Sequence, residues 1–306
     1  MKKLVIAGGS GFLGEVLIEY FKNTVDHIYI LTRSKMADKE NVSFVKWDAV
    51  NLGNWKNCLN DVDVLINLTG KSVDCRYDTY NKKAILSSRL ESTRVLGEAI
   101  KTLNKPPKTW INSSTATIYR HSLDVEMDEF SGEIGEGFSV EVANAWEKEF
   151  FSFSFSQTRQ VALRTSIVFG KNGGALQPIK KLTMLGFGGA QGNGDQKVSW
   201  IHELDFARAV SHIIDNILIS GPINIVSPKP TTNRILMKTI RKQLNIPFGI
   251  PMGERILNIG ARLINTETEL ILKSRNVIPK KLTDSGFNFE FKTLDSAIAN
   301  LLEKSK

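Results

Sequence analysis

The chain has 306 residues, of which 42% are hydrophobic and 24% are charged, and it carries a formal net charge of +8. This is the composition of a globular protein that is long enough to bury a core. Apolar runs such as residues 4–7 are far shorter than the roughly 20 residues that a membrane span requires, so we predict no membrane partner. The two cysteines, Cys58 and Cys75, fit neither a disulfide framework nor a metal-ligand spacing, which predicts a reducing, cytoplasmic location and no metal site.

The positive charge suits an anionic partner, and its distribution indicates which kind. Basic residues are dispersed along the chain, with nothing denser than two lysine pairs and a lysine-rich C-terminus. No zinc-finger, basic-helix or RNA-binding pattern accompanies them. We therefore predict a small anionic molecule as substrate, no nucleic acid, and a monomer or homodimer.

Short β-branched segments alternate with longer helical patterns over the first 170 residues, which is typical of a parallel sheet with helices on both faces. A helix is predicted directly after the first strand, and longer helices at residues 79–103 and 140–155. The fold class predicted is α/β, a Rossmann-type doubly wound parallel sheet. Its six strands are expected at residues 3–7, 27–32, 42–47, 63–68, 109–113 and 160–165.

The composition of the sequence changes after Gly170. Glycines are frequent between residues 173 and 194, which indicates a loop-rich stretch. One more strand at 223–226 and a helix at 233–244 follow. We therefore divide the chain into a Rossmann domain and a smaller C-terminal α+β substrate domain. The first is expected to cover 1–170, with 195–225 returning to it, and the second 171–306.

The first strand leads into Gly-Gly-Ser-Gly-Phe-Leu-Gly at residues 8–14, and the first helix begins inside this segment. A strand, a tight glycine turn and a helix start form the context in which free backbone N–H groups bind a pyrophosphate. Gly8 permits the turn, Gly11 lets the phosphates approach, and Gly14 lets the helix lie close to the sheet. The sequence therefore predicts a dinucleotide site, with a glycine-rich turn that binds nothing as the alternative.

The end of the second strand selects between NAD and NADP, because an acidic residue there binds the ribose 2′-hydroxyl and repels a 2′-phosphate. Residues 31–34 read Leu-Thr-Arg-Ser and contain no carboxylate. Arg33 can make charge-assisted hydrogen bonds to a phosphate, and Thr32 and Ser34 add hydroxyl donors. NADP is therefore predicted in preference to NAD, and a solvent-exposed arginine without a ligand is the alternative for Arg33.

With the glycine loop, the segments Asn-Leu-Thr-Gly at 67–70 and Ser-Ser-Thr-Ala-Thr-Ile-Tyr at 113–119 resemble the extended short-chain dehydrogenases/reductases. Further motifs, among them Leu-Arg-Thr at 163–165 and Trp-Ile-His at 200–202, are similar to an atypical, NAD-dependent epimerase-like subfamily with a distinctive C-terminal domain. The resemblance covers essentially the whole chain. Members are often labelled nucleotide-sugar epimerases, a label that follows the fold and says little about the reaction.

The resemblance implies a set of cofactor contacts that runs from the pyrophosphate through the adenosine to the nicotinamide. Some of these residues also have a structural alternative: Leu68 and Val168 can be core residues at strand ends, and Asp48 can cap a turn. The implied contacts are Gly8, Ser10, Gly11, Phe12, Leu13, Gly14, Thr32, Arg33, Asp48, Leu68, Thr69, Gly70, Arg89 and Val168.

In the larger family, a Ser or Thr after the fifth strand polarises the substrate oxygen, a Tyr is the acid/base, and a Lys four residues later lowers the tyrosine pKa. By resemblance, Thr115 stands at the Ser/Thr position, but the Tyr-x-x-x-Lys pair is missing. Aligning Glu147 with the helix glutamate usual in the family puts Ser139 and Ala143 at the two positions. Restoring Tyr and Lys there is expected to raise any reductase activity.

Two functions follow from these observations. The first is an NADP(H)-dependent, epimerase-like oxidoreductase of unknown substrate with a relocated proton donor, for which Tyr119 and His202 are the candidates. Either residue can instead be structural, Tyr119 by packing under its loop and His202 as a buried histidine. The second function is a catalytically weak or inactive NADP(H)-binding sensor or interaction protein, and a test of cofactor turnover with carbonyl compounds and sugar nucleotides separates the two.

Overall fold

The computed structural model describes residues 1–255, 257, 267 and 269–303. Seven strands form one sheet in the order β10-β6-β5-β4-β1-β2-β3, and every neighbouring pair is parallel. The predicted doubly wound parallel sheet is confirmed. Its strands are β1 (Lys3–Ala7), β2 (His27–Thr32), β3 (Val42–Lys46), β4 (Val64–Asn67), β5 (Thr109–Thr115), β6 (Arg159–Thr165) and β10 (Gly221–Ile225).

The order of the strands reverses direction at β1. Strands β2 and β3 extend the sheet on one side of β1, whereas β4, β5, β6 and β10 extend it on the other. The loops that follow β1 and β4 therefore diverge from adjacent strand ends. Ligands of open parallel sheets bind at this kind of point, outside the carboxyl ends of the strands.

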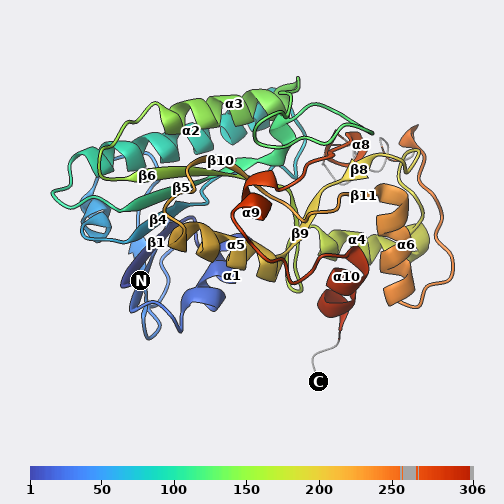
Figure 1. Cartoon of the computed structure of the whole chain (residues 1–306), viewed down its shortest axis with the longest axis horizontal. Coiled ribbons are helices and arrows are strands. Elements are labelled where there is room, and N and C mark those ends of the chain that lie inside the picture. The colour runs from blue at the N-terminus through green and yellow to red at the C-terminus, as the bar shows by residue number, and fades with distance from the viewer. Residues whose placement is uncertain (256, 258–266, 268, 304–306) are drawn as a thin grey trace.

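Helices cover both faces of the sheet (Figure 1). The helices α1 (Phe12–Phe21) and α5 (Glu203–Asp215) pack on one face. On the other face lie α2 (Thr79–Lys101) and α3 (Phe138–Phe151). Strands β1, β2, β4, β5 and β6 supply both cores by alternation, as the period of two along a strand requires.

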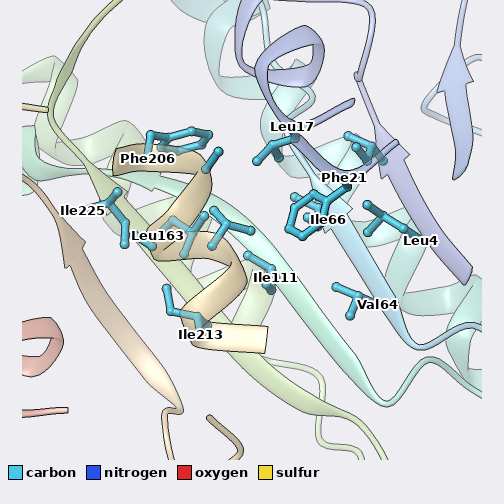
Figure 2. Packing of buried hydrophobic residues seen from close by; sticks show 14 of the residues in the cluster. Leu4, Leu17, Phe21, Val64, Ile66, Ile111, Leu163, Phe206, Ile213 and Ile225 are labelled. Atoms are coloured by element: carbon cyan, nitrogen blue, oxygen red, sulfur yellow. The ribbon is translucent and has the colours of Figure 1, made fainter. Parts of the chain in front are cut away.

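The core beneath α1 and α5 is continuous across the sheet, and none of the side chains labelled in Figure 2 is more than 3% exposed. Helix α5 was missing from the sequence prediction. Its buried Phe206, Ala209, Val210 and Ile213 nevertheless recur at helical spacing, so the signal was present within 195–225, the segment expected to return to the Rossmann domain. The labelled side chains are Leu4, Leu17, Phe21, Val64, Ile66, Ile111, Leu163, Phe206, Ile213 and Ile225.

A smaller group of elements has its own apolar core and contains two short two-stranded sheets, which confirms the C-terminal α+β part of the predicted fold class. Its helices α4, α6 and α10 lie beyond one end of the main sheet in Figure 1. The remaining elements are η1 (Asn54–Leu59), η2 (Ala116–Ile118), β7 (Ile167–Phe169), α4 (Leu176–Leu182), η3 (Thr183–Phe187), β8 (Lys197–Val198), β9 (Trp200–His202), β11 (Thr231–Thr232), α6 (Asn233–Gln243), α8 (Glu269–Leu272), α9 (Lys280–Asp284) and α10 (Leu294–Leu302).

Within the part of the chain that the structure describes, no helix combines the length and apolar character needed to cross a membrane.

Candidate cofactor and substrate site

A cavity of about 580 Å³ opens where β1, β4, β5 and β6 end. Its wall combines the glycine loop, the loop between β4 and α2, the end of β5, and the beginning of α3. The structure brings most of the predicted site residues together here. Those in the wall are Gly8, Gly11, Phe12, Leu13, Gly14, Leu68, Gly70, Arg89, Thr115 and Val168.

The three glycines of the loop between β1 and α1 differ in what an added side chain would meet. Gly8 has a φ of +74°, and a Cβ there would lie 3.0 Å from Thr69. A Cβ on Gly14 would collide with the backbone of Gly9, because α1 begins directly against the loop. A Cβ on Gly11 would meet only the carbonyl oxygen of Gly8, at 3.8 Å, so this position faces open space. The protein itself therefore requires glycine at 8 and 14 but leaves room at 11.

Phe12 connects the glycine loop to a second group of glycines. Added Cβ atoms on Gly170, Gly173 or Gly174 would collide with its ring. Part of the glycine-rich stretch after β6 is thus explained by the packing of Phe12. The ring also lines the cavity, so the same packing fixes the start of α1 beside the cofactor loop.

The predicted contacts to the adenosine lie outside the cavity wall. The hydroxyl of Thr32 donates to the Ser10 hydroxyl at 3.5 Å and accepts from the Ser34 backbone N–H at 3.3 Å. Arg33 is exposed, and within the described residues no hydrogen bond or ion pair holds its guanidinium. The Arg33 side chain is therefore free to meet a phosphate.

Asp48 adopts the turn-capping role that the sequence left open. Its carboxylate accepts hydrogen bonds from the backbone N–H groups of Val50 at 2.9 Å and Asn51 at 2.8 Å, and from the Asn51 side chain. These bonds, the one from the Asn51 backbone above all, lower the pKa of Asp48 to about 2. A contact between Asp48 and adenine stays a prediction.

The end of β4 is held by Asn67, which sequence reasoning missed. Its side chain accepts from the backbone N–H of Thr69 at 3.0 Å and donates to Asn112 at 2.8 Å. The hydroxyl of Thr69 is buried beside Gly8 and has no hydrogen-bond partner among the described residues. A buried hydroxyl without a partner costs about 1–3 kcal/mol, which favours a polar ligand at this place.

Arg89 belongs to α2, and its side chain lines the cavity. Its Nη1 donates to the backbone carbonyls of Lys71 and Ile85, both at 3.0 Å, and the guanidinium lies 5.1 Å from the ring centroid of Trp146. Burial lowers the pKa of Arg89 to about 10, so the group stays cationic at neutral pH. Lys71 also lines the cavity, and no described residue in the wall is acidic. The site is therefore positively charged.

The structure brings Thr115, the residue expected to polarise the substrate oxygen, to the cavity. It leaves Tyr119, a candidate proton donor, outside the cavity wall. The Thr115 hydroxyl lies 3.0 Å from that of Thr117 and accepts from the Thr117 backbone N–H at 3.2 Å. Tyr119 is 1% exposed; its phenol donates to Asn224 at 3.0 Å and accepts from Arg164 at 2.9 Å. Burial raises the pKa of Tyr119. These contacts correspond to the structural alternative for Tyr119.

His202 also lies outside the wall, and it caps α5. Its Nδ1 accepts from the Leu204 backbone N–H at 3.0 Å, its Nε2 lies 3.1 Å from the Asn300 side-chain oxygen, and its ring stacks on Phe291 at 3.8 Å. Burial lowers the pKa of His202 from 6.5 to about 4, so the ring is neutral at physiological pH. The geometry is that of a structural histidine.

We expect His202→Asn to flatten the acid side of the stability profile. The neutral ring stabilises the fold fully above pH 6.5, and this contribution is lost as the pH falls towards 4. Asparagine can still cap α5 but does not titrate, while the lost stacking costs about 1–2 kcal/mol at neutral pH. Urea unfolding between pH 4 and 7 measures both effects, and equal slopes for wild type and variant would contradict this assignment.

The structure corrects the expected restoration of the Tyr-Lys pair. Ser139 lines the cavity, but Ala143 is fully buried in an apolar cluster with Ile118, Met127 and Val277. A lysine at 143 would place its ammonium among these side chains instead of beside a cofactor, at a high desolvation cost. The cavity face of α3 follows Ser139, Val142 and Trp146 instead.

Several cavity residues were not found from the sequence. Tyr77 and Lys71 come from the loop after β4, Phe138 and Trp146 from α3, and Ser113 from β5. Trp146 donates to Thr93 at 3.0 Å, which fixes the indole under Arg89. The loop position of Tyr77, soon after a strand end, was the available signal for that residue.

Among the described residues, no group of three His, Cys, Asp or Glu side chains could hold a metal ion.

A parallel sheet that reverses at β1, with a glycine turn running into a helix, defines a nucleotide-cofactor-binding protein of the Rossmann class. The chain belongs to the NAD dependent epimerase/dehydratase family, whose model matches residues 4–225. A domain of unknown function, DUF1731, matches residues 256–301. The resemblance stated from the sequence is thereby confirmed.

Relatives from bacteria and from human match this chain over nearly its whole length. The chain is 33% identical over 304 residues to the epimerase family protein YfhF of Bacillus subtilis, with 99% of each chain covered. Among solved structures, it matches the human epimerase family protein SDR39U1 (isoform 2) with NADPH at a TM-score of 0.86 and 27% identity, covering 98% of this chain and 99% of that one. A nucleoside-diphosphate sugar epimerase of Corynebacterium glutamicum matches at a TM-score of 0.78 and 26% identity, covering 98% of this chain and 58% of that one.

Proposed function

We propose that this protein is an NADP(H)-dependent oxidoreductase or epimerase that acts on a small anionic substrate. The observation that carries the proposal is the positively charged cavity at the glycine loop, which Arg89 and Lys71 line without any acidic residue in the described wall. The NADPH in the structure of human SDR39U1 supports this choice of cofactor. The Thr69 hydroxyl, which has no hydrogen-bond partner among the described residues, fits a polar ligand as well.

In this proposal the chain supplies binding, orientation and a polarising group. NADPH, when bound, supplies a hydride for transfer. The backbone of the glycine loop and the start of α1 hold the phosphates, and Arg33 meets the 2′-phosphate. Thr115 hydrogen-bonds the substrate oxygen, and Arg89 attracts an anionic substituent of the substrate.

The proposal is tested by measuring cofactor affinity and then turnover. NADPH should bind, and its absorbance should fall when anionic carbonyl compounds or sugar nucleotides are added in a panel. If NADPH binds tightly but no compound is reduced or epimerised, the second function gains support. That function, a cofactor-binding sensor or interaction protein, is favoured by the missing Tyr-x-x-x-Lys pair.

Arg33→Ala should remove most of the preference for NADPH over NADH. Loss of its charge-assisted hydrogen bonds to a 2′-phosphate weakens NADPH binding about 10- to 100-fold and leaves NADH binding nearly unchanged. Fluorescence titration of both cofactors measures the change. Lys35→Ala, two residues further on and also exposed, is the matched control. Equal affinity of the wild type for the two cofactors would refute the role of Arg33.

A further inference from the structure

Tyr77 enters the cavity from the loop between β4 and α2, directly before Asp78, the N-cap of that helix. Its backbone N–H donates to Glu267 at 2.8 Å, and its ring packs edge to face on Phe138 with centroids 4.9 Å apart. The phenol is therefore held between the loop and the first turn of α3.

The Tyr77 phenol lies beside Ser139, the residue that aligns with the tyrosine of the larger family. The two hydroxyl groups are near enough for Ser139 to lower the pKa of the phenol. The Ser139 hydroxyl is nevertheless buried, and it makes no hydrogen bond of standard geometry with any described residue. Tyr77 and Ser139 line the same cavity, so a phenol from the loop after β4 lies at the start of α3, where the larger family carries its tyrosine.

A cation lines the same cavity as this phenol. Arg89 and Tyr77 both belong to the cavity wall, and an electrostatic interaction with Tyr77 raises the pKa of Arg89, against the lowering effect of burial. In the larger family the corresponding cation is a lysine on the helix of the tyrosine, four residues later. Here the cation is Arg89, which belongs to α2 and lies over the ring of Trp146.

We propose that Tyr77 is the proton donor of this site, with the Ser139 hydroxyl beside it and Arg89 as the accompanying cation. The inference rests on the proposed function, which it deepens by naming the donor. In the reduction of a carbonyl group, the carbonyl carbon gains hydride from the dihydronicotinamide and the C=O electron pair moves to the oxygen. The oxygen takes the phenolic proton of Tyr77, and the tyrosinate then regains a proton from water.

The surroundings of Tyr77 keep the phenol in its protonated form. Burial raises the pKa of the phenol, and the neighbouring Glu269, Cys75 and Glu267 raise it further, against the lowering effect of Ser139. The phenol is therefore protonated at neutral pH, which is the form that can donate a proton.

Tyr77→Phe tests the donor by kinetics. We expect kcat to fall about 10²- to 10⁴-fold while the Kd of NADPH and the KM change little, because the phenol acts on the reacting oxygen. Tyr80→Phe is the matched control, since Tyr80 lies three residues later and is 78% exposed. Unchanged kcat in Tyr77→Phe would overturn the proposal.

A second measurement needs no turnover. In protein labelled with 3-fluorotyrosine, the ¹⁹F resonance that disappears in Tyr77→Phe should shift when NADP⁺ or NADPH binds. It should not shift with 2′-phosphoadenosine 5′-phosphate, which lacks the nicotinamide. A resonance unmoved by saturating cofactor overturns the role of Tyr77 while leaving the proposed function intact. Failure of NADPH to bind the wild type overturns both.

Discussion

Glu147→Ala lowers the free energy of unfolding by about 3–5 kcal/mol, the largest loss of stability that we expect from one side chain outside the cavity. The Glu147 carboxylate accepts from Arg164 Nε at 2.9 Å and Nη2 at 2.8 Å, and from the Ser114 hydroxyl at 2.6 Å. The Arg164 and Glu147 side chains are only 10% and 11% exposed. Removing the carboxylate leaves a buried guanidinium without its counter-charge.

The chain offers a matched control for Glu147 two residues further along α3. Glu149 pairs with Arg94 at 2.9 Å, but the Arg94 side chain is 56% exposed. We expect Glu149→Ala to cost less than about 1 kcal/mol, because water screens the pair. Urea unfolding of the two variants measures the difference, and equal losses would show that burial of the Arg164 pair does not matter.

Gly11→Val is expected to abolish NADPH binding while leaving the fold nearly intact. The loss should be at least about 100-fold in Kd, equivalent to about 2.7 kcal/mol, since the branched side chain would fill the space that the phosphates need. Gly11 has a φ of −96°, which valine can adopt, and its Cβ would meet no close neighbour. Replacing glycine at this N-cap costs about 1 kcal/mol of stability. Circular dichroism and a cofactor titration separate the two effects.

Gly14→Ala should show the opposite balance. Its added methyl group would meet the backbone of Gly9, which cannot move without opening the loop. We therefore expect a lower melting temperature and weaker cofactor binding together. Unchanged NADPH affinity in natively folded Gly11→Val would mean that the loop has a structural role only.

The fold was largely readable from the sequence, because each strand of the sheet is a short apolar run and the glycine turn marks the start of α1. The misses have a physical pattern. Helix α3 begins at Phe138, two residues before the predicted start, and ends at Phe151, four before the predicted end. Helix α5 was hidden by the loop-like composition of the segment before it. The two-stranded sheets are too short for a periodic signal.

The site was predictable at the glycine loop, where neighbouring residues in the sequence form the structure that binds. It was less predictable opposite that loop. Tyr77 and Trp146 come from a loop and a helix far apart in the sequence, and only tertiary packing brings them to the cavity, whereas Arg89 was named by the family resemblance. Tyr119 and His202 were candidate proton donors because their side chains can donate a proton. In the structure, both are buried and hydrogen-bonded as structural groups. Residue type indicates chemistry only when the surroundings leave the group accessible.

The packing of Phe12 against Gly170, Gly173 and Gly174 predicts which positions change together among homologues and must be exchanged together in engineered chains. Gly170 and Gly173 form one unit with position 12, because a side chain on either glycine requires a smaller residue there, whereas Gly174 is also required by its φ of +66° and by the Val168 carbonyl. Among homologous chains, we expect positions 12, 170 and 173 to change together. A chimera that receives the glycine loop of a relative should therefore also receive that relative's segment 170–174. Otherwise the residue at position 12 will not pack against this segment, and the start of α1 will be displaced.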